Sequence, residues 1–206
     1  MKAKKAILAS GVRDHLPEIT GAAELYGRGL YQCPYCDGWE NRDEPLLIYG
    51  RGDERGGGMA LELTQWSRQL TLCTDGPGDL SPAMLKRLEE FCILVDERKI
   101  TSLAPDGSGL RADFSQGPPR FARAMFFNTS RSLQNKFAQA LGCQHATDET
   151  CGIDKNLQGR TNVPGLYVAG DASGDALQVI VAAAEGAAAG MSLNQELLQD
   201  AGVLAS

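Results

Sequence analysis

The sequence predicts an α/β fold built around a parallel sheet. Short apolar runs of strand length alternate along the chain with segments of helical periodicity, and this alternation is typical of parallel strands joined by helices. The strands are apolar throughout, as expected of strands covered on both faces. A glycine-rich segment separates one strand from the following helix, which indicates a Rossmann-like nucleotide-binding domain. The 206 residues suffice for one large domain or two small ones.

Composition and charge narrow the class of protein. The chain is 43% hydrophobic and 22% charged, which are ordinary values for a globular protein. A net charge of −6, with no basic run longer than Lys4-Lys5, argues against nucleic acid as a partner. The longest apolar stretch, 178–193, is interrupted by Glu185 and is too short to span a bilayer. We recognise no targeting segment, and therefore expect a cytoplasmic protein with no membrane partner.

The first 91 residues contain three predicted apolar strands. Residues 6–9 form the first, which ends at Ser10-Gly11 and leads into a loop with several glycines. Residues 46–49 are a continuous apolar run of four residues, the pattern of a strand buried on both faces, and 70–73 are a second predicted buried strand.

Two helices are expected beside these strands. Residues 59–68 place apolar side chains at 59, 63 and 66, on one helical face. Residues 81–91 begin with Ser81 as N-cap and Pro82 at the first helical position, where its missing N–H costs nothing.

From residue 92 onward, the chain continues the alternation and ends in a long helix over about 178–200. The predicted strands of this part are 92–95, two within 100–114 separated by an Asp106-Gly107 turn, 124–127 and 166–169.

The glycine-rich segment after strand 46–49 is a candidate dinucleotide-binding loop. Gly50 and Gly52 are followed by Gly56, so that the spacing is G-x-G-x-x-x-G, one residue longer than the usual fingerprint. Glycine allows the backbone to approach a pyrophosphate, and the next helix supplies N–H donors. Asp75 is the candidate acid for the ribose hydroxyl. The alternatives are a glycine-rich turn that binds nothing and an Asp75 that is only a turn residue.

A second candidate site is the Cys33-Pro34-Tyr35-Cys36 segment. Two cysteines separated by two residues can close a small disulfide ring, and one thiol of such a motif usually has a lowered pKa. The adjacent carboxylate of Asp37 could move a proton to or from the outgoing thiolate. A zinc site would need a second close pair of ligands, which we do not find, and we expect no metal. Cys73 and Cys92 fall in apolar strands and are expected to be buried packing residues.

These motifs resemble those of low-molecular-weight thioredoxin reductases. Residues 27–38 closely resemble the active-site run of that family, and Ala9-Ser10-Gly11 resembles a turn of its flavin domain. Residues 164–171 are similar to its C-terminal flavin motif, and Gln178-Val179 to the pair that begins the helix facing the flavin. Trp39-Glu40 after the cysteines, with no basic pair after strand 70–73, lies nearer the branch that includes gliotoxin-type dithiol oxidases.

The resemblance implies an electron relay through two domains. Residues 27–127 would be an NAD(P)-binding domain carrying the cysteines, inserted into a partial FAD-binding domain formed by 1–26 and 128–206. NADPH or NADH on the glycine loop would reduce FAD, which would exchange electrons with the cysteine pair. Cys36 would face the flavin, Cys33 would attack the partner disulfide, and Asp37 would be the acid and base.

The same resemblance assigns the other site residues. The flavin side would be held by Ser10, Gly11, Gly170, Asp171, Gln178 and Val179. The nicotinamide nucleotide would be held by Gly50, Gly52, Gly56 and Asp75. The partner would be a thioredoxin-like protein or a small disulfide, or, with the flow reversed, a dithiol that is oxidised. The family is commonly dimeric, which implies a homo-oligomer.

The chain also departs from the family pattern. The glycine-rich βαβ unit that holds the FAD pyrophosphate is missing, so we expect weak or no FAD binding by this chain alone. No arginine cluster is positioned to read a 2′-phosphate, so a strong preference for NADPH over NADH is not expected. The alternative to an enzyme is a flavin-free remnant that binds a nucleotide or a protein partner.

Overall fold

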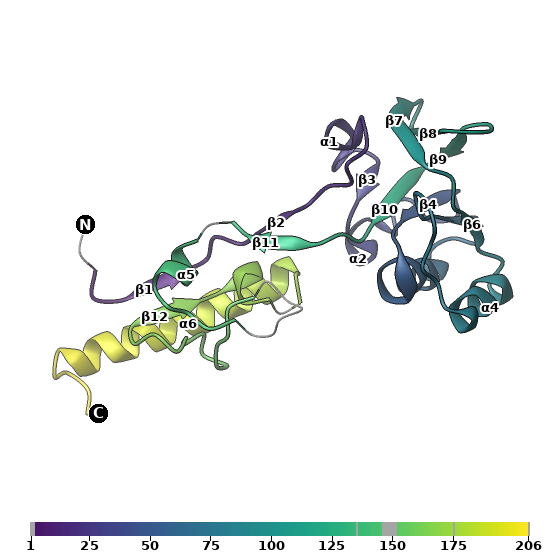
Figure 1. Ribbon diagram of the computed structural model, residues 1–206. Coiled ribbons are helices and arrows are strands. Elements are labelled where there is room, and N and C mark those ends of the chain that lie inside the picture. The colour runs from purple at the N-terminus through teal and green to yellow at the C-terminus, as the bar shows by residue number, and fades with distance from the viewer. Residues whose placement is uncertain (1–2, 135, 146–151, 175, 206) are drawn as a thin grey trace. The chain divides into compact units, whose positions relative to one another are not determined.

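The chain folds into two compact units, each described here by itself (Figure 1). Unit 1 comprises Met1–His15 and Ser130–Ser206, and unit 2 is the contiguous segment Leu16–Thr129. The computed structural model describes residues 3–134, 136–145, 152–174 and 176–205.

The first boundary between the units differs from the expected one. We expected residues 16–26 in the interrupted domain, but they pack in unit 2. Ile19, Ala22 and Leu25 are buried there in the core of unit 2, because helix α1 (Ala22–Leu25) presents its apolar side chains to the sheet.

Unit 2 is organised around a five-stranded sheet in which every pairing is parallel. In spatial order the strands are β3 (Leu30–Tyr31), β10 (Ala124–Phe127), β4 (Leu46–Tyr49), β5 (Leu70–Cys73) and β6 (Leu94–Asp96). The strand order reverses at β4, since the chain proceeds from β4 to β5 and β6 on one side and returns to β10 on the other. Such a switch point at the carboxyl ends of strands is where α/β sheets bind nucleotides.

The apolar runs of this sheet are buried on both faces, as the sequence predicts. Leu46 and Ile48 point into a core shared with helices α3 (Met59–Glu62) and α4 (Pro82–Glu90). The intervening Leu47 points to the opposite core, because successive side chains of a strand alternate between faces.

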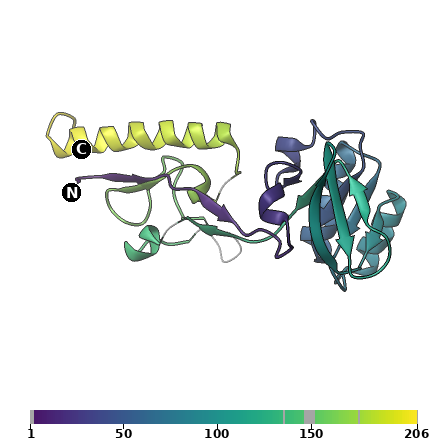
Figure 2. The same cartoon turned by 90° about the horizontal axis from the view of Figure 1, so that it is seen from above.

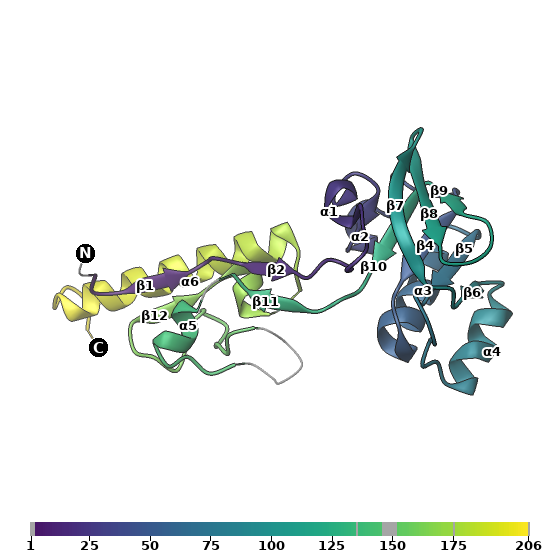
Figure 3. The ribbon, with the colours of Figure 1, turned by 45° about the horizontal axis from the view of Figure 1, so that its top comes forward.

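The opposite face is covered by a three-stranded antiparallel sheet that the sequence pattern only partly predicts. It consists of β7 (Ile100–Asp106), β8 (Gly109–Phe114) and β9 (Arg120–Ala122), drawn in teal in Figure 3. Asp106-Gly107 forms the predicted turn, with Gly107 at φ +55°. Strand β9 was not predicted.

Helix α4 of unit 2 begins where its cap indicates. In α4, Ser81 Oγ accepts a hydrogen bond from the Met84 N–H at 3.1 Å and Pro82 occupies the first position. The helix predicted over 59–68 is broken into α3 and a 3₁₀ turn over Leu63–Gln65. It is preceded by a π-helical turn over Gly52–Gly58, which holds the glycine loop.

In its described residues, unit 1 contains two pairs of strands and one long helix. Strand β1 (Ala6–Leu8) pairs in parallel with β12 (Leu166–Val168), and β2 (Val12–Asp14) pairs antiparallel with β11 (Arg131–Leu133). Helix α6 (Val179–Asp200), yellow to green in Figure 2, packs its Ala189 against Tyr167 of β12. The remaining elements are α5 (Phe137–Ala140) and a 3₁₀ turn, Gly170–Ser173. In the described parts of the chain, no helix is long and apolar enough to cross a membrane.

Candidate active site and cofactor sites

Cys33 and Cys36 form a disulfide, which is the pairing the sequence predicts. They begin the short helix α2 (Pro34–Asp37), with Cys33 as N-cap and Pro34 at the first helical position. The backbone N–H of Cys36 donates a hydrogen bond to Cys33 Sγ, with an N···S distance of 3.1 Å. A backbone N–H aimed at one sulfur favours the thiolate form of that cysteine after reduction.

The helix that carries the cysteines is packed against Trp66. A Cβ added to Gly38 would lie 2.7 Å from the Trp66 ring and would also overlap the Pro34 carbonyl. Only glycine therefore allows α2 to approach this ring. The Tyr35 ring meets the Trp66 ring edge-on, with 5.5 Å between the two ring centroids.

Asp37 directly follows the disulfide ring, at the end of α2. Partial burial raises the pKa of its carboxyl above the ordinary value, and the nearby charge of Glu40 raises it further. Its carbonyl oxygen accepts a 2.7 Å hydrogen bond from the buried Asn41 side chain, which fixes the backbone here. A carboxyl group that keeps its proton to higher pH is suited to donate that proton to a leaving thiolate.

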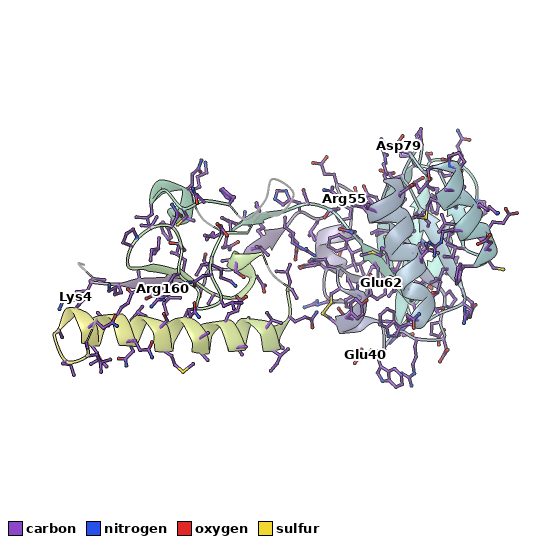
Figure 4. All side chains as sticks on the ribbon, turned by 90° about the horizontal axis from the view of Figure 1, so that it is seen from below. Lys4, Glu40, Arg55, Glu62, Asp79 and Arg160 are labelled. Atoms are coloured by element: carbon purple, nitrogen blue, oxygen red, sulfur yellow. A yellow bond between two sulfur atoms is a disulfide. The ribbon has the colours of Figure 1, made fainter. Side chains whose placement is uncertain are left out.

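Two exposed aromatic side chains flank the disulfide. Tyr35 is 70% exposed and Trp39 is 64% exposed. The Tyr35 hydroxyl is hydrogen-bonded to Glu62 of α3, and this bond raises the pKa of Tyr35. The Arg42 guanidinium stacks 3.9 Å from the centroid of the Trp39 ring. Glu40 and Glu62 are labelled in Figure 4.

The glycine loop lies at the carboxyl end of β4, where a nucleotide-binding loop is expected. Gly50 and Gly56 approach so closely that a Cβ on Gly50 would lie 2.9 Å from the Gly56 Cα. Gly52 has φ +72° and its N–H donates to the Gly78 carbonyl at 2.8 Å. Arg55, labelled in Figure 4, is an exposed residue of the same loop. The structure thus brings the three predicted glycines together.

Asp75 lies at the same edge of the sheet, just after β5, but its carboxylate has a structural partner. Its Oδ1 accepts a hydrogen bond from the Ile100 N–H at 2.7 Å. Arg51 Nε donates to the Thr74 carbonyl at 2.7 Å, and Arg51 Nη2 donates to the Asp75 carbonyl. The carboxylate therefore ties β5 to β7, which agrees with the turn-residue alternative. Its role toward a ribose remains a prediction.

The two flavin-type turns meet in unit 1. Because β1 and β12 are parallel neighbours, both turns leave the same end of the strand pair, and the Ala169 N–H donates to the Leu8 carbonyl at 3.1 Å. Together with α6 they surround an open cavity of about 310 Å³. Its lining residues are Ala9, Ser10, Gly11, Ala169, Gly170, Asp171, Ala182 and Gly186.

Two polar side chains of this lining, Ser10 and Asp171, fit the hydroxyl-bearing part of a flavin. Among the residues that the structure describes, none donates a hydrogen bond to the Asp171 carboxylate or pairs with its charge, which leaves it able to accept from hydroxyl groups. Gly170 has φ +70°, and a Cβ there would lie 3.4 Å from the Ala182 side chain. Gln178 and Val179 begin α6 as predicted but lie outside this lining, and Val179 is 88% exposed.

Sequence reasoning missed one residue of this region. Glu185 Oε2 accepts hydrogen bonds from the Gly170 N–H at 2.7 Å and from the Ser173 hydroxyl at 3.0 Å. Its other oxygen pairs with Lys155 Nζ at 3.2 Å. The sequence does give a signal for this residue, because Glu185 is the one acid in the alanine- and glycine-rich stretch 178–193. In the sequence analysis that signal served only to exclude a membrane span.

The free cysteines differ from expectation in one case. Cys73 is fully buried in β5, and burial raises the pKa of its thiol to about 12, which makes it unreactive. Cys92 was expected to be buried but is exposed. It falls in the turn after α4, with φ +57°, because β6 starts only at Leu94.

The fold and the site together define a class: an α/β protein with a Rossmann-type parallel sheet and a disulfide between two cysteines that are separated by two residues. The sequence profile of the pyridine nucleotide-disulphide oxidoreductase family matches residues 1–187. The chain belongs to this family.

Individual relatives agree with that assignment. Thioredoxin reductase tcpT of Claviceps purpurea is 27% identical over 204 residues, covering 96% of this chain and 63% of the relative. The crystal structure of HlmI is 28% identical with a TM-score of 0.87, covering 95% of this chain and 60% of the other. An oxidoreductase structure from Agrobacterium tumefaciens is 25% identical with a TM-score of 0.85, covering 94% and 64%.

These relatives are longer proteins. The chain spans 49% to 63% of the length of its curated relatives in Arthroderma benhamiae and Claviceps purpurea. The resemblance to thioredoxin reductases is confirmed, and so is the α/β fold.

Proposed function

We propose that this chain is the disulfide-carrying part of a thioredoxin reductase-like oxidoreductase. Its Cys33–Cys36 pair would pass two electrons between a flavin and an external disulfide or dithiol. The observation that carries the proposal is the disulfide itself, placed at the start of α2 with a backbone N–H directed at Cys33 Sγ. The family assignment supports the same chemistry.

The residues around the disulfide suggest how the exchange proceeds. In the reduced protein, the Cys36 N–H stabilises the Cys33 thiolate, which attacks one sulfur of the partner disulfide and forms a mixed disulfide. The departing partner sulfur takes a proton from Asp37, whose raised pKa keeps the carboxyl protonated to higher pH. Cys36 then attacks Cys33 Sγ, restores the ring and releases the second partner thiol. The partner gains two electrons and the pair loses two.

Residues of unit 1 would hold the flavin. Ser10 and Gly11 line the cavity from one turn, and Gly170 and Asp171 line it from the other. The Asp171 carboxylate would accept from the ribityl hydroxyls. A bound FAD would supply two-electron transfer to and from the disulfide. Gln178 and Val179 stay predictions, since α6 begins with them beside the cavity lining rather than within it.

Residues of unit 2 would hold NADPH or NADH. Gly50, Gly52 and Gly56 lie at the switch point of the parallel sheet, which is the general position for a nucleotide. The partner would be a thioredoxin-like protein or a small disulfide, reached through the exposed surface around Tyr35 and Trp39.

The test is a thiol titration of the flavin-supplemented protein under argon. With FAD and NADPH present, two thiols should appear per chain, and they should be lost again when an external disulfide is added. Cys36→Ser is the matched control, because it keeps Cys33 but cannot close the ring. Reduction by NADPH that is equally complete without added FAD, or none with it, would contradict the proposal.

A further inference from the structure

The Glu185 carboxylate binds three groups in unit 1, namely the Gly170 N–H, the Ser173 hydroxyl and the Lys155 ammonium. Glu185 is on α6, on the face turned toward β12, and its side chain is only 13% exposed. It accepts hydrogen bonds from the Gly170 N–H and the Ser173 hydroxyl, which are the first and last residues of the 3₁₀ turn Gly170–Ser173. Both ends of the turn are therefore fixed by one carboxylate.

The charge of this carboxylate is balanced locally. Lys155 Nζ lies 3.2 Å from Glu185 Oε1, and the Lys155 side chain is 11% exposed. A buried ion pair with further hydrogen bonds to its free lone pairs is the arrangement in which burial of two charges can be tolerated. Lys155 therefore allows Glu185 to remain an acceptor at this depth.

The turn held by Glu185 determines what the cavity presents to a ligand. Gly170 and Asp171 line the cavity, but the Gly170 N–H is used by Glu185. The turn consequently offers the Asp171 carboxylate as an acceptor and does not offer the Gly170 N–H as a donor. This polarity suits hydroxyl groups and disfavours a phosphate.

We propose that Glu185 is the positioning residue of the flavin site. By holding the Gly170 N–H and the Ser173 hydroxyl, it orients Asp171 toward the hydroxyl-bearing part of the flavin. The inference rests on the proposed function, because it requires flavin to bind in unit 1. Glu185 itself does not appear in the cavity lining, so its effect is transmitted through the turn.

The test compares two double variants that both remove the ion pair. Glu185→Gln with Lys155→Met keeps a side-chain oxygen that can accept from the Gly170 N–H. Glu185→Met with Lys155→Met has nearly the same shape but no such acceptor. FAD affinity is measured by titration of flavin fluorescence up to millimolar FAD, and the environment of the Gly170 N–H is followed by its amide NMR signal. We expect the Glu185→Gln, Lys155→Met variant to retain the wild-type FAD affinity and Gly170 amide shift. The Glu185→Met, Lys155→Met variant should bind FAD about tenfold more weakly.

Glu196 provides the control for general stability. It lies on the same face of α6, pairs with Lys5 at 2.9 Å and with Arg160 at 2.8 Å, and is outside the cavity lining. Arg160 is labelled in Figure 4. Glu196→Gln should lower the melting temperature without changing FAD affinity.

The outcomes separate the inference from the proposed function. Equal affinity of the two double variants, or equal weakening by Glu196→Gln, would overturn the positioning role while leaving flavin binding intact. No saturable FAD binding by the wild-type chain would overturn flavin binding in the proposed function, and the positioning role with it.

Discussion

The two sulfurs of the disulfide occupy unequal environments. Cys33 Sγ receives the Cys36 N–H, whereas Cys36 is the more exposed of the two residues. Asp37 follows directly and carries a raised pKa. These differences arise within five consecutive residues, so that the chemistry of the pair depends mainly on local backbone geometry.

The first prediction concerns the reversibility of this disulfide. Mild reduction should expose two additional thiols per chain, and removal of the reductant in air should hide them again. Cys92 should react with a thiol reagent in both states because it is exposed, and Cys73 in neither while the protein is folded. Tightly held stoichiometric zinc without a change of two thiols would contradict the assignment.

The second prediction concerns Asp37 as proton donor. Asp37→Asn should slow the release of the partner thiol by about 10²-fold or more, since general acid catalysis contributes on that order. In the wild type, the rate of this step should fall as pH rises through the raised pKa, because only the protonated carboxyl can donate.

The control for Asp37 is Glu40→Gln. Glu40 contributes to the raised pKa through its charge, so its removal should shift the falling limb of the pH profile to lower pH. The profile should be measured by stopped-flow thiol release. If the falling limb of the pH profile remained in Asp37→Asn, the proton donated to the leaving thiolate would have to come from another group.

At the scale of elements, α1 is held against β7 by a close backbone contact. Gly21, the N-cap of α1, has φ +88°, and a Cβ there would overlap the Leu103 carbonyl oxygen. The Leu103 N–H in turn donates to the Thr20 carbonyl at 2.8 Å. This contact fixes the first helix of unit 2 to the antiparallel sheet.

The third prediction follows from that contact. Gly21→Ala should lower the free energy of unfolding by about 2 kcal/mol or more, because both the φ angle and a backbone atom oppose a side chain. Gly190→Ala is the contrasting change, since Gly190 is helical with no atom near its Cβ position. It should be neutral or stabilise by up to about 1 kcal/mol. Urea unfolding of each variant is the measurement, and equal effects would refute the argument.

The strands with continuous apolar runs could be predicted from the sequence, and the short elements could not. Strands β4, β5 and β10 have the bounds expected, because runs of at least three buried side chains leave little choice of register. Strands β2 and β3 have two or three residues and mixed burial, so tertiary pairing decides them.

The candidate site, too, could be predicted only where its residues are close in the sequence. The spacing of Cys33 and Cys36 is local and predicts the ring. The bonds from Glu185 to Gly170 and from Asp75 to Ile100 join residues that are 15 and 25 positions apart. No local pattern specifies such pairs, because they depend on how α6 and β7 pack.

At the scale of whole units, a buried ion cluster connects β6 with β9. Asp96 is 5% exposed and accepts from Arg98 Nη2 at 2.7 Å and from Arg120 Nε at 2.6 Å. These bonds hold the pKa of Asp96 well below its usual range. The parallel sheet and the antiparallel sheet of unit 2 are thus joined by charge as well as by apolar packing.

The fourth prediction concerns acid stability of unit 2. A depressed carboxyl pKa stabilises the fold at pH values above the unfolded pKa, and this stabilisation is lost as pH falls through the folded pKa. Asp96→Asn should lower the free energy of unfolding by about 1.5–3 kcal/mol at neutral pH, because Arg98 and Arg120 lose the carboxylate that accepts their hydrogen bonds. It should also flatten the loss of stability below pH ~4. Asp113→Asn, at an exposed pair with Arg111, should have a much smaller effect.

The fifth prediction concerns FAD binding by the 206-residue chain. In the proposed function the cavity of unit 1 would hold the flavin-bearing end of FAD, and the residues that line it include no G-x-G-x-x-G turn for the pyrophosphate. We expect a Kd weaker than about 1 μM, measured by isothermal titration. Tighter binding would show that another part of the chain holds the pyrophosphate.

The pairing of β2 with β11 has a consequence for the order of folding. Arg131 Nε bonds to Asp14 Oδ1 across 117 positions of the sequence, with unit 2 lying between them in the chain. Closing so long a loop in an unfolded chain carries a large entropic cost. Unit 2 is contiguous and is complete first during synthesis from the N-terminus, and once folded it replaces that long flexible loop with a compact body. Unit 1 is therefore expected to assemble second, with its earliest strand waiting until the last helix has been made.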